Sequence, residues 1–472
     1  MASEHTKCQL PHALKRQLPL FTSDSPESSA SDFLIRFQQI SSKRERLKAL
    51  LESDLDFHGE DSIYASHNFH SFAAKFPPQL PRIFIHGLTN AGDIVLDPMM
   101  GSGTTLVETL LEGRKGVGFD IDPLALRLGY AKTITIDRNK LRELGNKVLK
   151  KAYHYLSDGE KVQRSLSHLF DKKTKSFIDY WFLPNTQREL MALTLAIQDV
   201  TDKLARQFLE LTLSSIIVTK SGGVSRARDL AHSRPHLDET KIPKDALEQF
   251  SIRLRKNLNG VGESTVNGVV GLVIGADARS MPIADGVVNL IVTSPPYANA
   301  IDYMRAHKFS LVWFGASISE LSRLRATYVG SERIGLTVHD LLPEFPQRIV
   351  HELQQLDQKK GAILGKYFVE MKAIFSEMFR VLREDSAAIV VVGTSTMRGM
   401  DTQTHHCLAD IAARTGFDVV GVTRRTMDRN KRMMPARFGK KTSTIEDRMH
   451  EEYIIGLLKP ALSFRSKSHY KA

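Results

Sequence analysis

Short apolar runs alternate with amphipathic, helix-like stretches over much of the chain. Each apolar run ends in turn residues, and most are followed by a longer segment with helical periodicity, the pattern of a β-strand and its crossover helix. The runs lie within residues 92–113, 115–123, 271–297, 386–396, 415–425 and 450–459, and 271–297 holds two of them. This alternation predicts an α/β protein with a doubly wound parallel sheet, whose ligand site lies at the carboxyl ends of the strands.

Three segments do not follow the alternation. Residues 1–60 read as a polar N-terminal extension with one helix within 33–53. Residues 133–265 have mainly helical periodicity and separate the second strand from the third, while residues 298 to about 360 separate the fourth strand from the helix before the fifth. The last two segments are therefore expected to be insertions in the α/β domain, and each is a candidate region for recognising a target.

Composition narrows the class of protein. The 65 Lys and Arg exceed the 53 Asp and Glu by 12, which favours a polyanionic partner. The two cysteines, Cys8 and Cys407, cannot form a disulfide framework or a cysteine-rich zinc site. No apolar run approaches the length of a membrane span, and the N-terminus lacks the apolar core of a signal peptide. We therefore expect a cytoplasmic protein, associated with the nucleoid and making no membrane contact.

Acidic residues stand at three strand ends. Asp97 is followed by a turn containing Gly101 and Gly103, where the missing side chains let backbone amides approach a ligand. Asp120 and Asp277 end the next two strands. The turn is neither the dinucleotide fingerprint nor a P-loop, because the spacing G-x-G-x-x-G and a Lys-Ser or Lys-Thr step are both absent. One such acid would more often be a cap, but three around a glycine loop indicate a nucleoside ligand.

Four stretches together resemble the amino-methyltransferases of DNA that modify cytosine N4 or adenine N6. These are VLDPMMGSGTT (95–105), GVGFDIDP (116–123), IGADARSMP (274–282) and VTSPPY (292–297), which resemble motifs I to IV of that family; HSFAAKFPPQLPRIFI (70–85) resembles its motif X. The resemblance implies a class I methyltransferase-like fold, with a mostly parallel seven-stranded sheet built from 61–132 and 266–460 and a helical insertion at 133–265. It also implies S-adenosylmethionine as cofactor, bound by residues that include Phe76, Asp97, Pro98, Gly101, Gly103, Thr104, Asp120 and Asp277.

By the same resemblance, Asp97, Gly101 and Gly103 line the amino-acid end of the cofactor, Asp120 meets its ribose and Asp277 its adenine. Motif I usually has an aromatic residue after Asp-Pro, whereas Met99 stands there in this chain. We expect this departure to alter ring packing and to leave binding intact.

The turn Ser294-Pro295-Pro296-Tyr297 carries the predicted chemistry. An exocyclic base amine is a poor nucleophile because its lone pair is delocalised into the ring, so acceptors must draw the nitrogen toward tetrahedral geometry. The Ser294 hydroxyl and the Pro295 carbonyl can both accept from the amine, Pro296 keeps that carbonyl rigid, and Tyr297 offers a face for stacking. The base must leave the duplex to reach them. Serine at the first position goes mostly with cytosine N4 in the resembling families; adenine N6, a base amine in RNA and a silent DNA-binding subunit remain alternatives.

Two other chemistries are disfavoured. Methylation at cytosine C5 needs a nucleophilic cysteine, usually in a Pro-Cys step, but Cys8 follows Lys7 and Cys407 follows His406. The sequence THHCLAD (404–410) suggests no metal site, because adjacent residues on a helix point in different directions. We expect no metal.

Basic segments supply candidate contacts to double-stranded DNA. The stretch GGVSRARDLAHSRPH (222–236) ends the first insertion, and RRTMDRNKRMMPARFGKK (424–441) should connect the last two strands beside the catalytic face. We expect a monomer or weak dimer, with a cognate restriction endonuclease as a possible separate partner. The predicted DNA-contacting residues are Arg226, Arg228, Arg424, Arg425, Lys431, Arg432 and Arg437.

Overall fold

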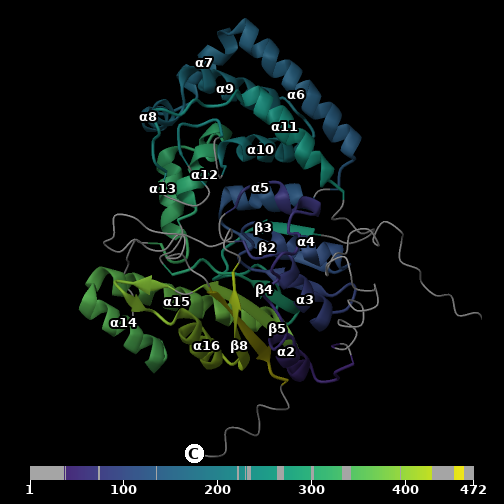
Figure 1. Ribbon diagram of the computed structural model, residues 1–472, viewed down its shortest axis with the longest axis vertical. Coiled ribbons are helices and arrows are strands. Elements are labelled where there is room, and N and C mark those ends of the chain that lie inside the picture. Colours follow the sequence, from purple (N-terminus) through teal and green to yellow (C-terminus); the bar gives the residue numbers. More distant parts are fainter. Residues whose placement is uncertain are drawn as a thin grey trace, which may run out of the picture.

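A seven-stranded sheet forms the centre of the computed structural model (Figure 1). The structure describes residues 37–461, except 38, 73–74, 134, 220–222, 229, 231–234, 263–270, 299–301, 332–341, 394 and 428–450. The strand order is β3-β2-β1-β4-β5-β9-β8; β1 to β5 are parallel to one another, and β9 runs antiparallel to both β5 and β8. The strands are β1 (Ile94–Asp97), β2 (Lys115–Asp120), β3 (Gly271–Gly275), β4 (Val288–Thr293), β5 (Leu382–Gly393), β8 (Asp418–Thr426) and β9 (Glu451–Lys459).

This arrangement confirms the predicted fold class, and each predicted strand lies in the expected stretch of sequence. Neighbouring residues of the central strands face opposite sides of the sheet, and both sides are covered. Leu290 and Ile389 pack in one core, whereas Ile291 and Val390 pack in the other. The continuous apolar run in β5 is therefore the signature of a strand buried on both faces.

Helices cover both faces of the sheet, and a separate group of helices lies above its β3 edge (Figure 1). On one face α2 and α3 pack against β1, β4, β5 and β9, and on the other α15 and α16 pack against the same sheet. Among the described residues, no helix is long and apolar enough to cross a membrane. The helices beside the sheet are α2 (Lys43–Leu51), α3 (Gln79–Leu88), α4 (Thr104–Leu111), α5 (Pro123–Lys132), α14 (Glu344–Leu356), α15 (Gln358–Val381) and α16 (Thr404–Arg414).

The predicted N-terminal extension has its expected helix at α2, within residues 33–53, and this helix packs on the sheet. Leu47, Leu50 and Leu51 of α2 are buried against the sheet. The end of α2 is also tied to β8, because the Thr423 hydroxyl donates to the Leu51 carbonyl over 2.8 Å. The apolar spacing i, i+3, i+4 is a helical stripe that the many charges of α2 conceal.

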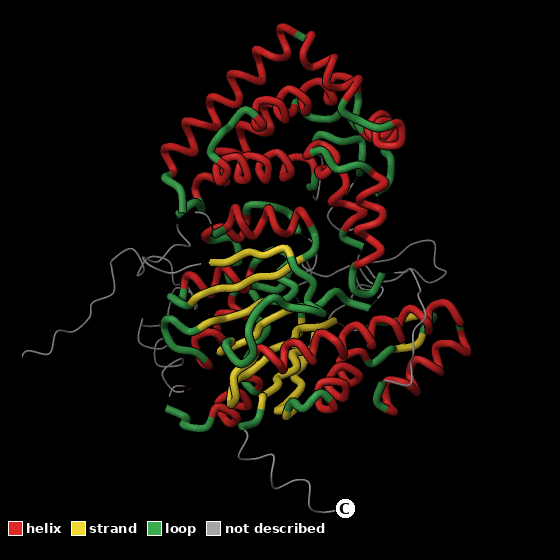
Figure 2. Tube along the Cα trace, turned by 180° about the vertical axis from the view of Figure 1, so that it is seen from behind, coloured by secondary structure: helices red, strands yellow, loops and turns green. Residues whose placement is uncertain are grey.

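The first insertion and the first part of the second form one helical lobe, whereas α14 of the second insertion packs with α15 and α16. The described residues of the first insertion form six helices: α6 (Arg138–Asp158), α7 (Glu160–His168), α8 (Lys172–Trp181), α9 (Pro184–Gln198), α10 (Lys203–Ile217) and α11 (Ala246–Asn259). They share a core with two helices of the second insertion, α12 (Met304–Leu311) and α13 (Ile318–Thr327), and Trp313 lies fully buried in it. Figure 2 shows this lobe stacked on one end of the sheet, with α5 between them.

A buried carboxylate fastens the segment before α3 to α4. Glu108 accepts hydrogen bonds from His67 Nε2 (2.6 Å), the Tyr64 hydroxyl (2.8 Å) and Arg82 Nε (2.7 Å). Its side chain is fully buried, and these donors together hold the pKa of Glu108 below its usual value against the cost of burial. Because the segment leads into residues 72–76, Glu108 positions part of the cleft described below.

Glu108→Ala is expected to destabilise the protein by about 3–5 kcal/mol, because it removes the acceptor of His67 and Tyr64 and leaves the buried Arg82 guanidinium with the more distant Glu112 carboxylate, 3.5 Å away. Urea unfolding followed by circular dichroism measures this difference. Glu143→Ala, which removes an exposed carboxylate paired with Lys147 on α6, is the control and should leave the midpoint unchanged. Equal midpoints for the two variants would contradict the anchoring role of Glu108.

Candidate active site

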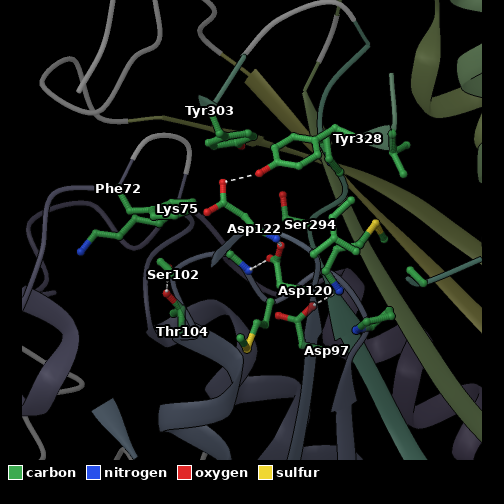
Figure 3. Close-up of a pocket in the computed structure, with 18 of the residues that line it drawn as sticks. Phe72, Lys75, Asp97, Ser102, Thr104, Asp120, Asp122, Ser294, Tyr303 and Tyr328 are labelled. Atoms are coloured by element: carbon green, nitrogen blue, oxygen red, sulfur yellow. Dashed lines mark hydrogen bonds between the residues drawn. The ribbon is translucent and has the colours of Figure 1, made fainter. Parts of the chain in front are cut away.

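One cleft opens at the carboxyl ends of β1, β2, β3 and β4 (Figure 3). It encloses about 860 Å³ of space free of protein atoms, part of it open to solvent. The structure brings nine of the predicted site residues together on its wall: Phe76, Asp97, Pro98, Gly101, Thr104, Asp120, Asp277, Ser294 and Pro296.

The glycine loop between β1 and α4 adopts a backbone conformation that other residues rarely adopt. Gly101 and Gly103 have φ angles of +45° and +70°. A Cβ added to Gly101 would also lie 3.2 Å from the Phe72 ring, so only glycine fits without displacing that ring. Gly103 does not line the cleft; it is the residue that precedes the first turn of α4.

Asp97 joins β1 to the end of β4. Its Oδ1 accepts from the Thr293 hydroxyl over 2.7 Å and from the Met99 amide over 3.2 Å. Burial raises the pKa of Asp97 to about 6, and these hydrogen bonds offset part of the rise. Ser294 follows Thr293 directly, so this bond sets the position of the Ser294 turn relative to the glycine loop.

Asp120 ends β2 with both carboxylate oxygens engaged by backbone amides. Oδ2 accepts from Gly101 (2.9 Å) and Oδ1 from Asp122 (2.8 Å). Burial and the nearby Asp122 carboxylate raise the pKa of Asp120 to about 7. Each oxygen keeps a lone pair, so the ionised group can still accept from two hydroxyls of a ligand.

Asp277 lies on the wall in an ion pair with Arg279. Arg279 Nε lies 2.9 Å from Oδ1, and its Nη2 lies 2.6 Å from Oδ2. The pairing lowers the pKa of Asp277 although burial acts in the opposite direction. Arg279 also donates to Glu370 of α15 and to the Thr327 carbonyl at the end of α13.

The second insertion supplies one side of the cleft, which the sequence analysis missed. Tyr328 and Val329 line the cleft together with Tyr303. Figure 3 shows Tyr328 donating to Asp122, whose Oδ2 also lies 2.6 Å from His307 Nδ1 of α12. The His307 and Tyr328 bonds lower the pKa of Asp122 against the cost of burial. Asp122 thus links the loop after β2 to the helical lobe.

An aromatic pair and a cation complete this side. The rings of Phe72 and Tyr303 stack with centroids 5.4 Å apart, and Lys75 lies on the same wall (Figure 3). Phe72 and Lys75 fall within the stretch that resembles motif X, and the Asp-Pro step of Asp122 marks a helix start. These signals could have identified Phe72, Lys75 and Asp122, whereas no periodic pattern points to Tyr303 or Tyr328.

Pro295 and Tyr297 are not on the cleft wall. Both are buried, and the Tyr297 hydroxyl donates to Glu452 over 2.8 Å. The Tyr297 ring therefore has no open face on which a base could stack in this arrangement, and the predicted stacking stays a prediction.

The predicted DNA-contacting residues are dispersed. Arg226 is half-buried and Arg228 is exposed, both at the edge of the helical lobe, and Arg424 is exposed beside Glu451. For Arg425 the predicted contact with DNA has to be corrected. Its side chain is buried in an ion pair with Glu452, because alternate residues of β8 face opposite ways, and it is not available to a phosphate. Lys431, Arg432 and Arg437 lie outside the described residues.

In the described part of the chain, no three His, Cys, Asp or Glu side chains are grouped to hold a metal ion.

The chemistry of the wall fits S-adenosylmethionine. Asp120 offers acceptors suited to ribose hydroxyls, and the glycine loop exposes backbone near the cleft. Asp97 provides an acidic group that matches the ammonium of an amino acid, whereas the Lys75 ammonium donates to the His67 carbonyl over 2.9 Å. Ala276, Ala278 and Val329 supply apolar surface on the wall that also holds Asp277.

Comparison with known proteins agrees with this geometry. Residues 37–131 match a family model described as DNA methylase, of the N6/N4 class. The type II methyltransferase M.MvaI of Kocuria varians is 22% identical over 76% of this chain and 83% of its own length. M.BsoBI of Geobacillus stearothermophilus is 22% identical over 67% and 72%, and M.MjaII of Methanocaldococcus jannaschii is 27% identical over 46% and 40%.

Solved structures give weaker matches. A TehB-like methyltransferase from Corynebacterium glutamicum, described as SAM-dependent, covers 91% of this chain and 99% of its own, at 11% identity and a TM-score of 0.26. A geranyl diphosphate methyltransferase in complex with SAM covers 81% and 85%, at 9% identity and a TM-score of 0.30. These scores add nothing to the fold, which the strand order already defines. The family model and the type II methyltransferases together support the assignment of this chain to the DNA amino-methyltransferases.

Proposed function

We propose that this protein transfers a methyl group from S-adenosylmethionine to the N4 amine of cytosine within a short site in double-stranded DNA. The observation that carries the proposal is the position of Ser294. It lies on the same cleft wall as Asp97, Asp120 and the glycine loop, so a cofactor held by those groups would face the Ser294 hydroxyl.

The residues around the cofactor bind it by complementary charge and hydrogen bonding. Asp120 accepts from the ribose hydroxyls, while Asp97 holds the ammonium of the amino-acid end. Asp277, already paired with Arg279, faces the adenine side. When bound, the cofactor supplies an electrophilic methyl group on a sulfonium.

Ser294 and the Pro295 carbonyl act on the base. The flipped cytosine presents its amino group, and both oxygens accept hydrogen bonds from it, which favours the pyramidal nitrogen of the transition state. The prolines hold this turn rigid and contribute no amide donor that could compete with the amine. Serine at the first position of this turn is what favours cytosine N4 over adenine N6.

DNA recognition is assigned to the helical lobe and the basic edges of the cleft. Arg226 and Arg228 lie at the edge of that lobe, and Arg424 lies at the end of β8; all three carry charges suited to phosphates. The relatives are type II methyltransferases, so we infer that the chain is the modification part of a restriction–modification system.

The test is to express the protein in a host without DNA methylation, digest the genomic DNA to nucleosides and identify the methylated species by mass spectrometry. N4-methylcytosine in one sequence context is expected. N6-methyladenine would overturn the serine argument, and unmodified DNA with methylated RNA, or with no methylation, would overturn the DNA substrate.

Ser294→Ala should lower kcat on the order of 100-fold while leaving cofactor affinity unchanged, because it removes an acceptor used mainly in the transition state. Rapid-quench transfer from tritiated cofactor to DNA, together with calorimetry of S-adenosylhomocysteine binding, separates the two effects. Ser280→Ala, at an exposed position beyond β3, is the control. Full activity of Ser294→Ala would remove Ser294 from the mechanism.

Affinity for S-adenosylhomocysteine should rise as the pH rises through about 7 and level off above it. The Asp120 carboxyl, whose pKa is raised to about 7, must lose its proton before it accepts from two hydroxyls, so affinity falls by up to about tenfold for each pH unit below that value. Asp97, with a pKa of about 6, steepens the fall below pH 6.

Calorimetry between pH 5.5 and 8.5 measures this dependence. Asp120→Asn should bind weakly and lose the change near pH 7, whereas Asp158→Asn, at the exposed end of α6, should behave like the wild type. A wild-type affinity that is constant from pH 6 to 8 would contradict the role of Asp120.

A further inference from the structure

Two arginines of the second insertion share one carboxylate beside the cleft. Arg305 Nε and Arg325 Nη2 lie 2.9 Å and 2.5 Å from the same oxygen of Asp302, Oδ2. Arg305 belongs to the first turn of α12, and Arg325 belongs to the last turn of α13. The shared acid therefore holds the end of α13 next to the start of α12.

These side chains belong to residues that are close in sequence to the cleft wall. Asp302 directly precedes Tyr303, and Arg325 comes three residues before Tyr328; both tyrosines line the cleft (Figure 3). Burial and the Asp122 charge raise the pKa of Tyr328, and the Asp302 charge adds to the rise. The two ion pairs thus lie within electrostatic range of the cleft wall.

The group carries more positive charge than Asp302 can neutralise. Lys308 of α12 adds a third cation, and its ammonium lies 5.0 Å from the centroid of the Phe177 ring. Burial lowers the pKa of Lys308, Asp302 opposes the fall, and the two guanidiniums add to it. Three cations around one acid leave an excess of two positive charges. We call Asp302, Arg305, Lys308 and Arg325 the cation cluster.

The arginines of the cation cluster keep hydrogen-bond donors that solvent can reach. Their side chains are 30% and 42% exposed, whereas the Asp302 side chain is only 17% exposed. Among the residues that the structure describes, Asp302 is the single ion-pair partner of each guanidinium, which has five N–H donors. The planar fork of these donors matches the oxygens of a phosphate. The cation cluster therefore has both the charge and the donors to bind phosphodiesters.

We propose that Arg305 and Arg325 contact the phosphates that flank the flipped nucleotide. A base that leaves the duplex and enters the cleft brings its sugar and both neighbouring phosphates to the edge of the cleft. Contacts to phosphates fix the register of a protein on its duplex. The inference rests on the proposed function, because only a base inside the cleft places these phosphates beside the cation cluster.

Arg305→Ala and Arg325→Ala test the contact through its dependence on salt. Each lost phosphate contact makes the plot of log affinity against log salt concentration less steep by about 1. We expect this change in each variant, and about twice as much in the double variant, between about 50 and 200 mM salt. Fluorescence anisotropy measures it, with S-adenosylhomocysteine and a duplex that carries the sequence methylated in the host.

The control is Arg164→Ala, which breaks an exposed ion pair with Glu160 on α7, at the end of the lobe away from the sheet (Figure 1). It should leave the slope unchanged. Arg325→Lys keeps the charge and should also keep the slope, which separates a phosphate contact from a loss of packing.

Asp302→Asn distinguishes a phosphate site from an ion pair that only joins α12 to α13. The substitution removes the one negative charge of the cation cluster and leaves both guanidiniums to the DNA, so affinity for the duplex should rise about two- to tenfold. A purely structural ion pair predicts the opposite sign, since losing the acid would then weaken binding as the arginine variants do.

Neutral methylphosphonates in place of both phosphates that flank the target nucleotide locate the contact. On that duplex Arg325→Ala and the wild type should have equal slopes, because the charges that the arginine meets are gone. Unchanged slopes in both alanine variants, weaker binding by Asp302→Asn, or a difference that persists on the neutral duplex would each overturn the inference.

The proposed function and this inference can fail separately. A wild-type protein that methylates no DNA overturns both of them. A wild type that methylates DNA, together with arginine variants whose slopes match the wild type, overturns the inference alone.

Discussion

The hydrogen bond between Asp97 and Thr293 is the constraint on which the site depends. It joins the ends of β1 and β4 over 2.7 Å, at the point where one strand leads into the glycine loop and the other into Ser294. A second side chain of the same loop region, Thr105, donates to the Val292 carbonyl over 3.1 Å. The cofactor side and the catalytic side of the cleft are thus fixed to each other before any ligand binds, which is the preorganisation that electrostatic catalysis needs.

The helical lobe is tied to the same cleft through the acid that follows β2. Asp122 caps α5 and holds both His307 and Tyr328 of the second insertion, and Arg279 holds the end of α13. A lobe attached at these points cannot move without disturbing Tyr303 and Tyr328 on the cleft wall. Binding of any ligand to the lobe and occupancy of the cleft are therefore expected to be energetically linked, in both directions.

Much of the sheet and half of the cleft could be predicted from the sequence because those features are local. A strand buried on both faces is a continuous apolar run, and the acid or turn that ends it marks the edge where the site lies. The rest depends on packing between distant segments: His307 and Tyr328 meet Asp122 across 185 and 206 residues. Two details have local causes: the charges of α2 conceal the apolar stripe that packs on the sheet, and the alternation of a strand turns Arg425 inward although Arg424 faces solvent.

The most direct test of the proposed site is a crystal structure of the protein with sinefungin and a duplex containing its target site. We expect the ribose hydroxyls of the analogue within about 3 Å of the Asp120 carboxylate, and the amino group of a flipped cytosine at the same distance from the Ser294 hydroxyl. An analogue bound outside the cleft, or a target amine that contacts neither Ser294 nor the Pro295 carbonyl, would contradict it.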